Sequence, residues 1–167
     1  MCPDSICATT CQNNPEDVKV YIHRAINESR NTGIDILVAP YYEDHHWVLL
    51  VVWISRGIIF MYDSLRTSPM RRLLIMPLFS SVFRNICGGG GHVKKITWKQ
   101  MKCAKQTGGL ECGFYIMRFM FDVIKSIAEG HDLEQVYTSN VRDDALSTAE
   151  ISEIRDMWAI FVSDNFL

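Results

Sequence analysis

The sequence predicts an α+β fold with a central, mainly antiparallel sheet flanked by helices. Two apolar segments, residues 46–54 and 58–63, are separated by only three residues, and so short a connection requires an antiparallel hairpin. Helical patterns lie before and after this hairpin, at residues 15–33 and 112–128. We expect one domain over residues 1–167, since a chain of this length can bury roughly 70% of its unfolded surface.

The composition is that of an ordinary globular domain, with 48% hydrophobic residues and 17 Lys and Arg against 19 Asp and Glu. This apolar content argues against intrinsic disorder, and a formal net charge of −2 argues against a nucleic-acid partner. The longest apolar run, Trp47 to Ile54, is far shorter than the roughly 20 residues that span a bilayer, so no membrane partner is expected. The first residues lack a secretory signal, which predicts an intracellular protein, nuclear or cytoplasmic, with six free cysteines.

The segment before the hairpin predicts one helix and one strand. Asn14 can cap a helix at residues 15–33, and Pro15 suits its first turn. A buried strand follows at residues 34–39 and is expected to end at the next residue, a proline. A polar loop at residues 41–44 then leads into the hairpin.

After the hairpin, the pattern predicts a helix at residues 70–83 that is interrupted by Pro77. A run of four glycines at residues 88–91 indicates a flexible loop, and a strand is expected at residues 93–98. Residues 103–111 have the composition of a loop.

Two further helices are expected. Residues 112–128 predict a central, buried helix, because apolar residues occupy more than one of its faces. The last helix begins with Ser147-Thr148-Ala149-Glu150, a capping-box pattern. Its apolar stripe comprises Ile151, Ile154, Trp158, Phe161 and Val162.

Cys112 is a candidate nucleophile because of its place at the start of a predicted helix. The thiolate is the reactive form of cysteine, and the positive end of a helix dipole stabilises it. A flexible loop that contains glycine precedes it and can expose the thiol. The alternative is a buried cysteine with a structural role.

A nucleophilic cysteine needs a base, and the base needs an orienting carboxylate. Among five histidines, His46 opens a buried strand, where an imidazole can be held firmly. Asp63 ends the next strand, and the hairpin pairing puts it opposite or diagonal to His46, roughly 5–8 Å away at Cβ. Asp63 as a turn-starting residue and His46 as a strand-end histidine are the alternatives. The other histidines are His23, His45, His92 and His131.

Acyl transfer also needs hydrogen-bond donors for the oxyanion that forms on the substrate carbonyl. The backbone N–H of Cys112 is one candidate. The side-chain amide of Gln106, six residues earlier on the loop, is another.

These motifs together resemble a known family. His46-Trp47, then Tyr62-Asp63-Ser64, then the segment from Gln106 to Gly113 are similar in order and spacing to the ubiquitin-like-protein-specific (SUMO) cysteine proteases. The resemblance runs from about residue 34 to the C-terminus, and the final helix with Trp158 is similar to plant and transposon-borne members. It implies a papain-like cysteine protease fold with the nucleophile at a helix N-terminus.

The resemblance implies an activity that needs no cofactor and no metal. Cys112 would attack the carbonyl after the C-terminal Gly-Gly of a ubiquitin-like protein, SUMO or one of its conjugates. His46 would act as the base, Asp63 would orient it, and Gln106 would stabilise the oxyanion. The implied substrate-binding residues are Trp47, Gly109 and Glu111.

The sequence departs from the family pattern in several places. Gly108 stands where many members have Asn, and Glu111 stands where many have Asp before the nucleophile. No tryptophan precedes Trp47, and the domain is expected to be short at its N-terminus. Trp47 itself matches the tryptophan that covers the Gly-Gly tunnel, with a core strand residue as the alternative.

Other functions remain open from the sequence. Cys2, Cys7 and Cys11 lie near His23 and are a candidate metal site, although no C-x-x-C pair occurs. A catalytically weak module that binds a ubiquitin-like protein is the second alternative. A deubiquitinase or an acetyltransferase on the same scaffold is the third.

Overall fold

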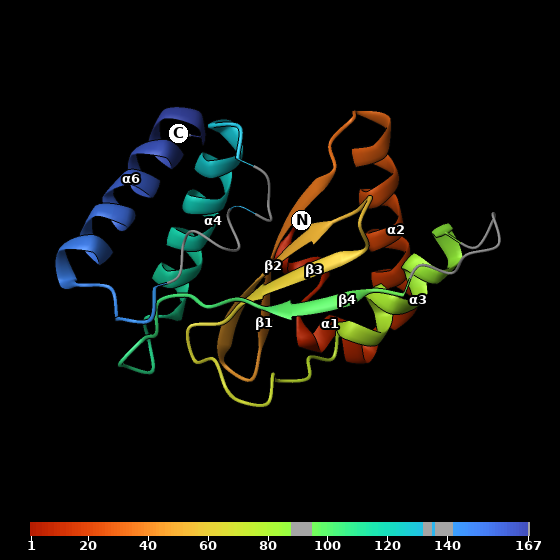
Figure 1. The fold of residues 1–167 in the computed structure, drawn as a ribbon, viewed down its shortest axis with the longest axis horizontal. Helices are drawn as coiled ribbons and strands as arrows, with labels where there is room; N and C mark the ends of the chain where they lie inside the picture. The colour runs from red at the N-terminus through yellow and green to blue at the C-terminus, as the bar shows by residue number, and fades with distance from the viewer. Residues whose placement is uncertain (88–94, 132–134, 136–141, 167) are drawn as a thin grey trace. The chain divides into compact units, whose positions relative to one another are not determined.

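The structure is a computed structural model that describes residues 1–87, 95–131, 135 and 142–166 (Figure 1). The chain forms two compact units. Unit 1 comprises Met1–Met61 and Thr67–Gln100, and unit 2 comprises Tyr62–Arg66 and Met101–Leu167. The predicted glycine loop at residues 88–91, His92 and the start of the strand expected at 93–98 lie outside the described residues.

A four-stranded sheet with the order β1-β2-β3-β4 confirms the α+β prediction. β1 and β2 are antiparallel, and the short turn between β2 and β3 makes that hydrogen-bonded pair antiparallel as well. β4 pairs with β3 in parallel, so the sheet is mixed at one edge. The strands are β1 (Ile36–Glu43), β2 (His46–Trp53), β3 (Ile58–Tyr62) and β4 (Thr97–Gln100).

β1 is longer than the sequence predicts. It continues through Pro40 to Glu43, where we expected a strand end and a polar loop. Proline is tolerated there because β1 is the edge strand of the sheet that the described residues form, and no described strand pairs with its other side. As a result, β1 ends at Glu43, the residue that pairs with His46 across the hairpin.

Two short helical elements open unit 1, η1 (Pro3–Ser5) and α1 (Ala8–Asn13). Neither was predicted from the sequence. Asn14 closes α1 by donating its N–H to Thr10 O at 2.9 Å, and α2 (Pro15–Asn31) begins directly after it. Asn14 makes no side-chain capping bond, so the predicted cap is wrong although the predicted helix is confirmed.

α3 (Met76–Cys87) also differs from its prediction. Residues 70–75 are not helical, and Pro77 lies in the first turn of α3 instead of interrupting a longer helix. The first turn accommodates proline because the N–H groups there have no partner within the helix. Phe79 N–H instead reaches back to Ile75 O at 3.1 Å.

The core of unit 1 lies between one face of the sheet and the helices α1, α2 and α3. α2 and α3 contact each other, as the ribbon also shows (Figure 1). The sheet contributes alternate residues, as the two-residue period of a strand requires. The completely buried members with the largest side chains include Tyr41, Phe79, Ile22, Ile26 and Ile59.

In unit 2, α4 (Cys112–Ala128) packs against α6 (Thr148–Phe166), and the two lie side by side (Figure 1). The bounds of α4 agree with the sequence prediction, but the helix is not buried on all sides, because Ile124 is exposed. The capping box of α6 is confirmed, with Ser147 N–H donating to Glu150 Oε2 at 2.8 Å. Phe161 in the predicted apolar stripe is 49% exposed, so this stripe is not buried along its whole length.

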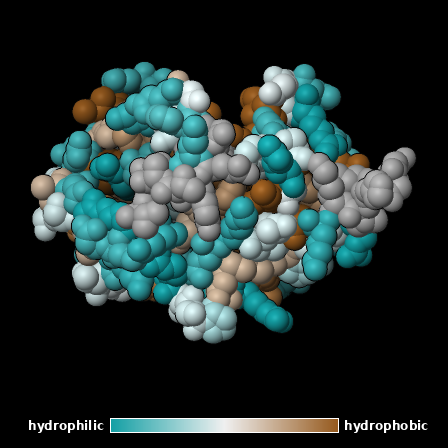
Figure 2. All heavy atoms as spheres, in the orientation of Figure 1, coloured by the Kyte–Doolittle hydropathy of each residue, from teal (hydrophilic) through white to brown (hydrophobic). Residues whose placement is uncertain are grey.

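Among the described residues, no helix has both the length and the apolar character needed to cross a bilayer. On the face shown in Figure 2, hydrophobic residues occur in small groups between polar ones. Such scattered apolar surface is normal for a folded domain.

Candidate functional site

His46 is the first residue of β2, directly after a tight turn in unit 1. Glu43 is paired with His46 across the hairpin, so only Asp44 and His45 form the turn. Both have positive φ angles, 51° and 61°, which is the requirement of a type I′ turn. His46 is buried, with 4% of its surface exposed, whereas His45 is exposed.

A buried carboxylate anchors this turn from the other strand. Glu43 Oε2 accepts hydrogen bonds from the Tyr41 hydroxyl and from Leu74 N–H, the latter at 2.9 Å. Arg71 lies with Nη2 at 3.7 Å from Glu43 Oε1 and at 2.6 Å from Asp44 Oδ2. Burial, followed by the hydrogen bond to Glu43, raises the pKa of the Tyr41 hydroxyl, so the phenol stays protonated and remains a donor.

Trp47, the predicted tunnel residue, follows His46 and is half-buried. Its ring contacts that of Tyr42, with a centroid separation of 4.9 Å. The indole is therefore held against its neighbour on β1 while part of its surface remains accessible. Its substrate-binding role stays a prediction.

In unit 2, the segment Tyr62–Arg66 is bonded to the loop that begins at Met101. Gln106 N–H donates to Ser64 O at 3.1 Å, and the Cys103 thiol donates to Asp63 O at 3.5 Å. Arg66 adds bonds from Nη1 to Met101 O at 3.3 Å and to Cys103 O at 3.4 Å. These hydrogen bonds hold the two segments together, although they are far apart in the sequence.

Asp63 lies at the start of this segment and is 1% exposed. One carboxylate oxygen, Oδ1, accepts the Leu65 N–H at 2.9 Å. This is the turn-starting role that the sequence offered as an alternative. The predicted pairing of Asp63 with His46 stays a prediction, because the two residues belong to different units.

Gln106 is buried and its amide is bonded at both ends. The Ser64 hydroxyl donates to Oε1 at 2.5 Å, and Nε2 donates to Gly108 O at 2.7 Å. Sequence analysis included Ser64 in a motif but gave it no role. Its contact with Gln106 was not foreseen, because the two residues are 42 positions apart.

Cys112 is the first residue of α4 and is 6% exposed, which confirms its predicted place at a helix start. As first residue, it has a backbone N–H without a partner inside the helix, which can serve as an oxyanion donor. Glu111 is the N-cap residue, although its side chain makes no capping bond. Its carboxylate instead lies against Gly108, at 3.5 Å from the position that a Cβ would occupy there.

Gly109 and Leu110 complete the loop before Cys112. Gly109 is exposed, and a Cβ built on it would meet no atom within 4 Å. Leu110 is 95% exposed, an unusual state for a large apolar side chain. The loop therefore presents backbone and one apolar side chain to any ligand, and Leu110 is a second residue that sequence analysis missed.

The first turn of α4 is fixed by Tyr115. Its hydroxyl donates to Lys105 O at 3.3 Å and accepts Leu146 N–H at 2.9 Å. Tyr115 thereby bonds the loop before Cys112 to the segment before α6. This contact keeps the start of α4 in place from two sides.

Four further cysteines are described as free thiols: Cys2, Cys7, Cys11 and Cys103. Burial raises the pKa of the Cys11 and Cys103 thiols to about 11, so both are protonated and unreactive at neutral pH. A hydrogen bond from Thr10 lowers the pKa of Cys7. In the described part of the chain the thiols are free, and no three His, Cys, Asp or Glu residues there are grouped to hold a metal ion.

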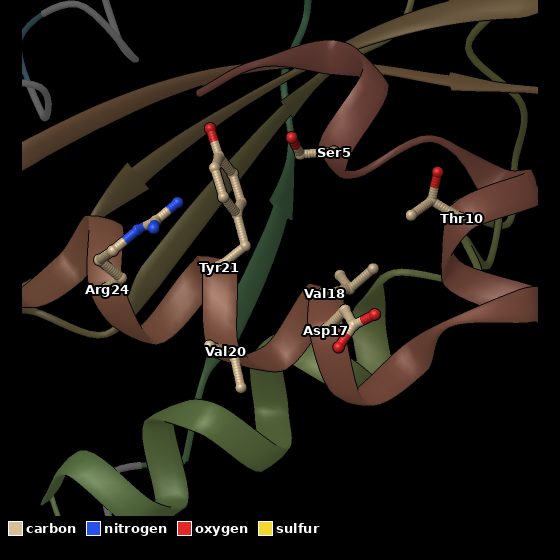
Figure 3. Close-up of a pocket in the computed structure, with 7 residues that line it drawn as sticks. All are labelled: Ser5, Thr10, Asp17, Val18, Val20, Tyr21 and Arg24. Atoms are coloured by element: carbon tan, nitrogen blue, oxygen red, sulfur yellow. The ribbon is translucent and has the colours of Figure 1, made fainter.

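A pocket of about 320 Å³ lies at the N-terminal end of unit 1, between α2 and the segment that carries Ser5 (Figure 3). Tyr21 projects from α2 toward it, and its hydroxyl accepts Cys2 N–H at 2.7 Å. None of the predicted site residues lines it. The lining residues are Ser5, Thr10, Asp17, Val18, Val20, Tyr21 and Arg24.

Several solved structures have the same fold. The first is SUMO protease Ulp1 with its catalytic cysteine oxidised to a sulfenic acid, 15% identical with a TM-score of 0.60. The match covers 93% of this chain but only 64% of that one, so this chain spans less than two thirds of that structure's length. A comparison with curated protein sequences gives no match.

Two complexes are similar as well. Xanthomonas campestris effector protein XopD bound to ubiquitin is 20% identical, with a TM-score of 0.56 and coverage of 95% of this chain and 74% of that one. The C-terminal Ulp1 protease domain in complex with SMT3, the yeast ortholog of SUMO, is 14% identical, with a TM-score of 0.54. That match covers 89% of this chain and 62% of the other.

The fold is thus the one used by cysteine peptidases of the SUMO-protease type. The sequence model of the Ulp1 protease family, C-terminal catalytic domain, matches residues 3–162. The chain belongs to this family, which confirms the family that the motifs indicate. The similarity of the final helix to plant and transposon-borne members stays a prediction.

Proposed function

We propose that the chain is a cysteine protease that hydrolyses the peptide or isopeptide bond after the C-terminal Gly-Gly of a ubiquitin-like protein. Cys112 is the nucleophile and His46 the general base. Asp63 orients the imidazole, and Gln106 donates to the oxyanion. The observation that carries the proposal is the place of Cys112 at the first position of α4, in a chain that belongs to the Ulp1 family.

The chemistry follows from these roles. His46 takes the thiol proton, and Cys112 Sγ bonds to the carbonyl carbon of the last glycine. The oxyanion accepts hydrogen bonds from Cys112 N–H and from the Gln106 amide. Collapse of this intermediate breaks the C–N bond, and the amine leaves with the proton held by His46. Water then hydrolyses the thioester and regenerates the thiol.

SUMO is the ubiquitin-like protein that we propose as substrate. Similar structures bind either SMT3 or ubiquitin, which supports a partner of this class. The exposed Gly109 and Leu110 before the nucleophile offer an extended tail backbone contacts and one apolar contact. Trp47 and Glu111 are the further substrate contacts in this proposal. A thiolate nucleophile must stay reduced, so we also propose an intracellular setting.

The proposal is tested with SUMO and ubiquitin that carry an electrophile in place of the C-terminal carboxylate. We expect the SUMO probe to label the wild-type chain and to leave Cys112→Ser unlabelled. Labelling of Cys112→Ser would contradict the choice of nucleophile. Reaction with ubiquitin alone would change the substrate, and binding without labelling would indicate a non-catalytic module.

His46 and His45 form a matched pair for the role of base. We expect His46→Ala to lower turnover by about 10³-fold or more, since loss of a triad member has effects of this order. His45→Ala is expected to stay within a few-fold of the wild type, because His45 is an exposed turn residue. The reverse outcome would transfer the role of base to His45.

A further inference from the structure

Ser64 makes two hydrogen bonds with Gln106, and both lie within unit 2. Its carbonyl accepts Gln106 N–H at 3.1 Å, and its hydroxyl donates to Gln106 Oε1 at 2.5 Å. Ser64 is 1% exposed, so water does not compete for this hydroxyl. The backbone of Gln106 and the end of its side chain are therefore held by one residue.

These contacts determine which way the Gln106 amide faces. Gly108 O lies 2.7 Å from the other end of the amide, and a carbonyl can only accept a hydrogen bond. Nε2 must therefore be the atom at Gly108, and Oε1 must be the atom at Ser64. A flipped amide would bring two acceptor oxygens together at Gly108.

The orientation matters because only Nε2 can stabilise an oxyanion. The amide nitrogen carries two N–H groups, of which Gly108 O takes one, and the second is a donor for a ligand. If the hydroxyl of Ser64 were absent, Oε1 would lose its buried donor, and only the bond from Nε2 to Gly108 O would still hold the amide. The direction of the second N–H would then be less well fixed, and electrostatic catalysis depends on fixed donors.

We propose that Ser64 is a positioning residue that holds Gln106 Nε2 in the direction of the oxyanion. The proposal rests on the role of Gln106 in the proposed function. Ser64 touches neither the substrate nor the thiol in this mechanism and acts only through Gln106. Its removal should therefore affect the chemical step and leave substrate binding unchanged.

The test is a double-mutant cycle on the whole chain with a fluorogenic SUMO substrate. We expect Gln106→Ala to lower kcat by about 10²-fold, the loss typical of one oxyanion donor, and Ser64→Ala by about tenfold, since it leaves the amide in place. KM should stay within twofold in both variants. In the Gln106→Ala background, Ser64→Ala should change kcat by less than about twofold, because its only route of action is gone.

Two controls separate positioning from a structural effect. Gln106→Glu keeps an acceptor for Ser64 but removes the N–H donor, and we expect it to be as slow as Gln106→Ala. Thr67→Ala removes an exposed hydroxyl that lies close to Ser64 in sequence, and it should keep wild-type kcat. Urea unfolding of each variant checks that the fold persists.

Several outcomes would overturn the role of Ser64. They are a Ser64→Ala variant with wild-type kcat, effects of Ser64→Ala and Gln106→Ala that multiply in the double variant, or a Ser64→Ala chain that does not fold. Wild-type activity in Gln106→Ala is a different result, because it contradicts the role of Gln106 in the proposed function. The two failures are thus distinguishable.

Discussion

Glu43 is a buried carboxylate whose oxygens are satisfied by groups from its own strand and from the segment before α3. Leu74 N–H and the Tyr41 hydroxyl both donate to Oε2. Removal of the acceptor would leave the buried Tyr41 hydroxyl and the part-buried Leu74 N–H without this partner, which is more costly than the loss of one exposed bond. Together with the ion pair between Arg71 and Asp44, this carboxylate attaches the turn before His46 to the segment before α3.

We expect Glu43→Ala to lower the free energy of unfolding by about 1–3 kcal/mol, the usual cost of unsatisfied buried groups. Urea unfolding followed by circular dichroism measures the change. Glu28→Ala is the matched control, because its contact with Arg24 at 3.9 Å is exposed and should contribute less than about 0.5 kcal/mol. Equal stability of the two variants would show that Glu43 does not anchor the turn.

His45 has a φ angle of 61°, which is unfavourable for a residue with a side chain. Glycine adopts this conformation without strain, and Asp-Gly is a preferred pair in a type I′ turn. We expect His45→Gly to raise the free energy of unfolding by up to about 1 kcal/mol, measured by urea unfolding. A clear loss of stability would mean that the His45 side chain has a structural role that its exposure does not suggest.

At the scale of elements, the start of α6 depends on one capping box. Ser147 Oγ accepts Glu150 N–H at 3.3 Å, and Glu150 Oε2 accepts Ser147 N–H. Arg142 and then Ser147 lower the pKa of Glu150 to about 2. The folded state therefore favours the charged carboxylate more than the unfolded chain does, in which the pKa is 4.5.

The sign of the pH effect follows from this difference. The contribution of Glu150 to stability is complete above pH 4.5 and is lost as the pH falls through about 2. We expect Glu150→Gln to remove part of the acid sensitivity of the chain, measured by urea unfolding at about pH 5 and about pH 3. Glu153→Gln, on the same helix, is the control, and an equal effect of both variants would contradict the special role of the cap.

The serine of the box gives a second test of the same element. Ser147→Ala should cost about 1 kcal/mol, as the loss of a helix cap usually does, and Ser147→Asp should restore most of it. Failure of Ser147→Asp to restore stability would indicate that the hydroxyl of Ser147 acts through its own donation to Glu150 and not as an acceptor.

Local signals in the sequence predicted the elements that depend on local chemistry. The capping box and the start of α4 at Cys112 are of this kind, because caps, charges and periodicity lie within a few residues. The extension of β1 through Pro40 was missed, since it depends on the place of β1 at the edge of the described sheet. The exposed Phe161 was missed for a similar reason, because burial depends on what packs over a helix.

The candidate site also has features that local sequence predicts and others that depend on long-range contacts. Its residue types and their spacing could be read from the motifs, as His46, Asp63, Gln106 and Cys112 show. The contact of Ser64 with Gln106 could not, because nothing in either local sequence indicates a partner 42 positions away. The anchoring of Glu43 by Leu74 N–H is another long-range contact of this kind.

At the scale of the whole molecule, neither unit is a continuous piece of chain. Unit 2 needs the short segment Tyr62–Arg66, which supplies the Tyr62 ring to Phe119 at 5.7 Å between centroids and Ser64 to Gln106. A cut at the apparent boundary, before Met101, would remove these contacts. Phe119 on α4 would then lose its contact with the Tyr62 ring.

We therefore expect the fragment 101–167 to unfold without a cooperative transition in urea. The same fragment with residues 62–66 joined to its N-terminus by a glycine linker should regain a sigmoidal transition, followed by circular dichroism. A cooperative transition in the short fragment would show that Tyr62–Arg66 is dispensable. Loss of the regained transition on Tyr62→Ala would identify the ring contact with Phe119 as its source.

The parallel pairing of β4 with β3 has a consequence for the order of folding. β1, β2 and β3 are joined by tight turns and can pair as soon as they are synthesised, since short loops close quickly. β4 must wait for the long connection that contains α3, and Ser64 must wait for the loop that carries Gln106. The strands β1, β2 and β3 can therefore pair before Gln106 is held by Ser64, so the oxyanion donor of the proposed function is fixed later than most of the sheet.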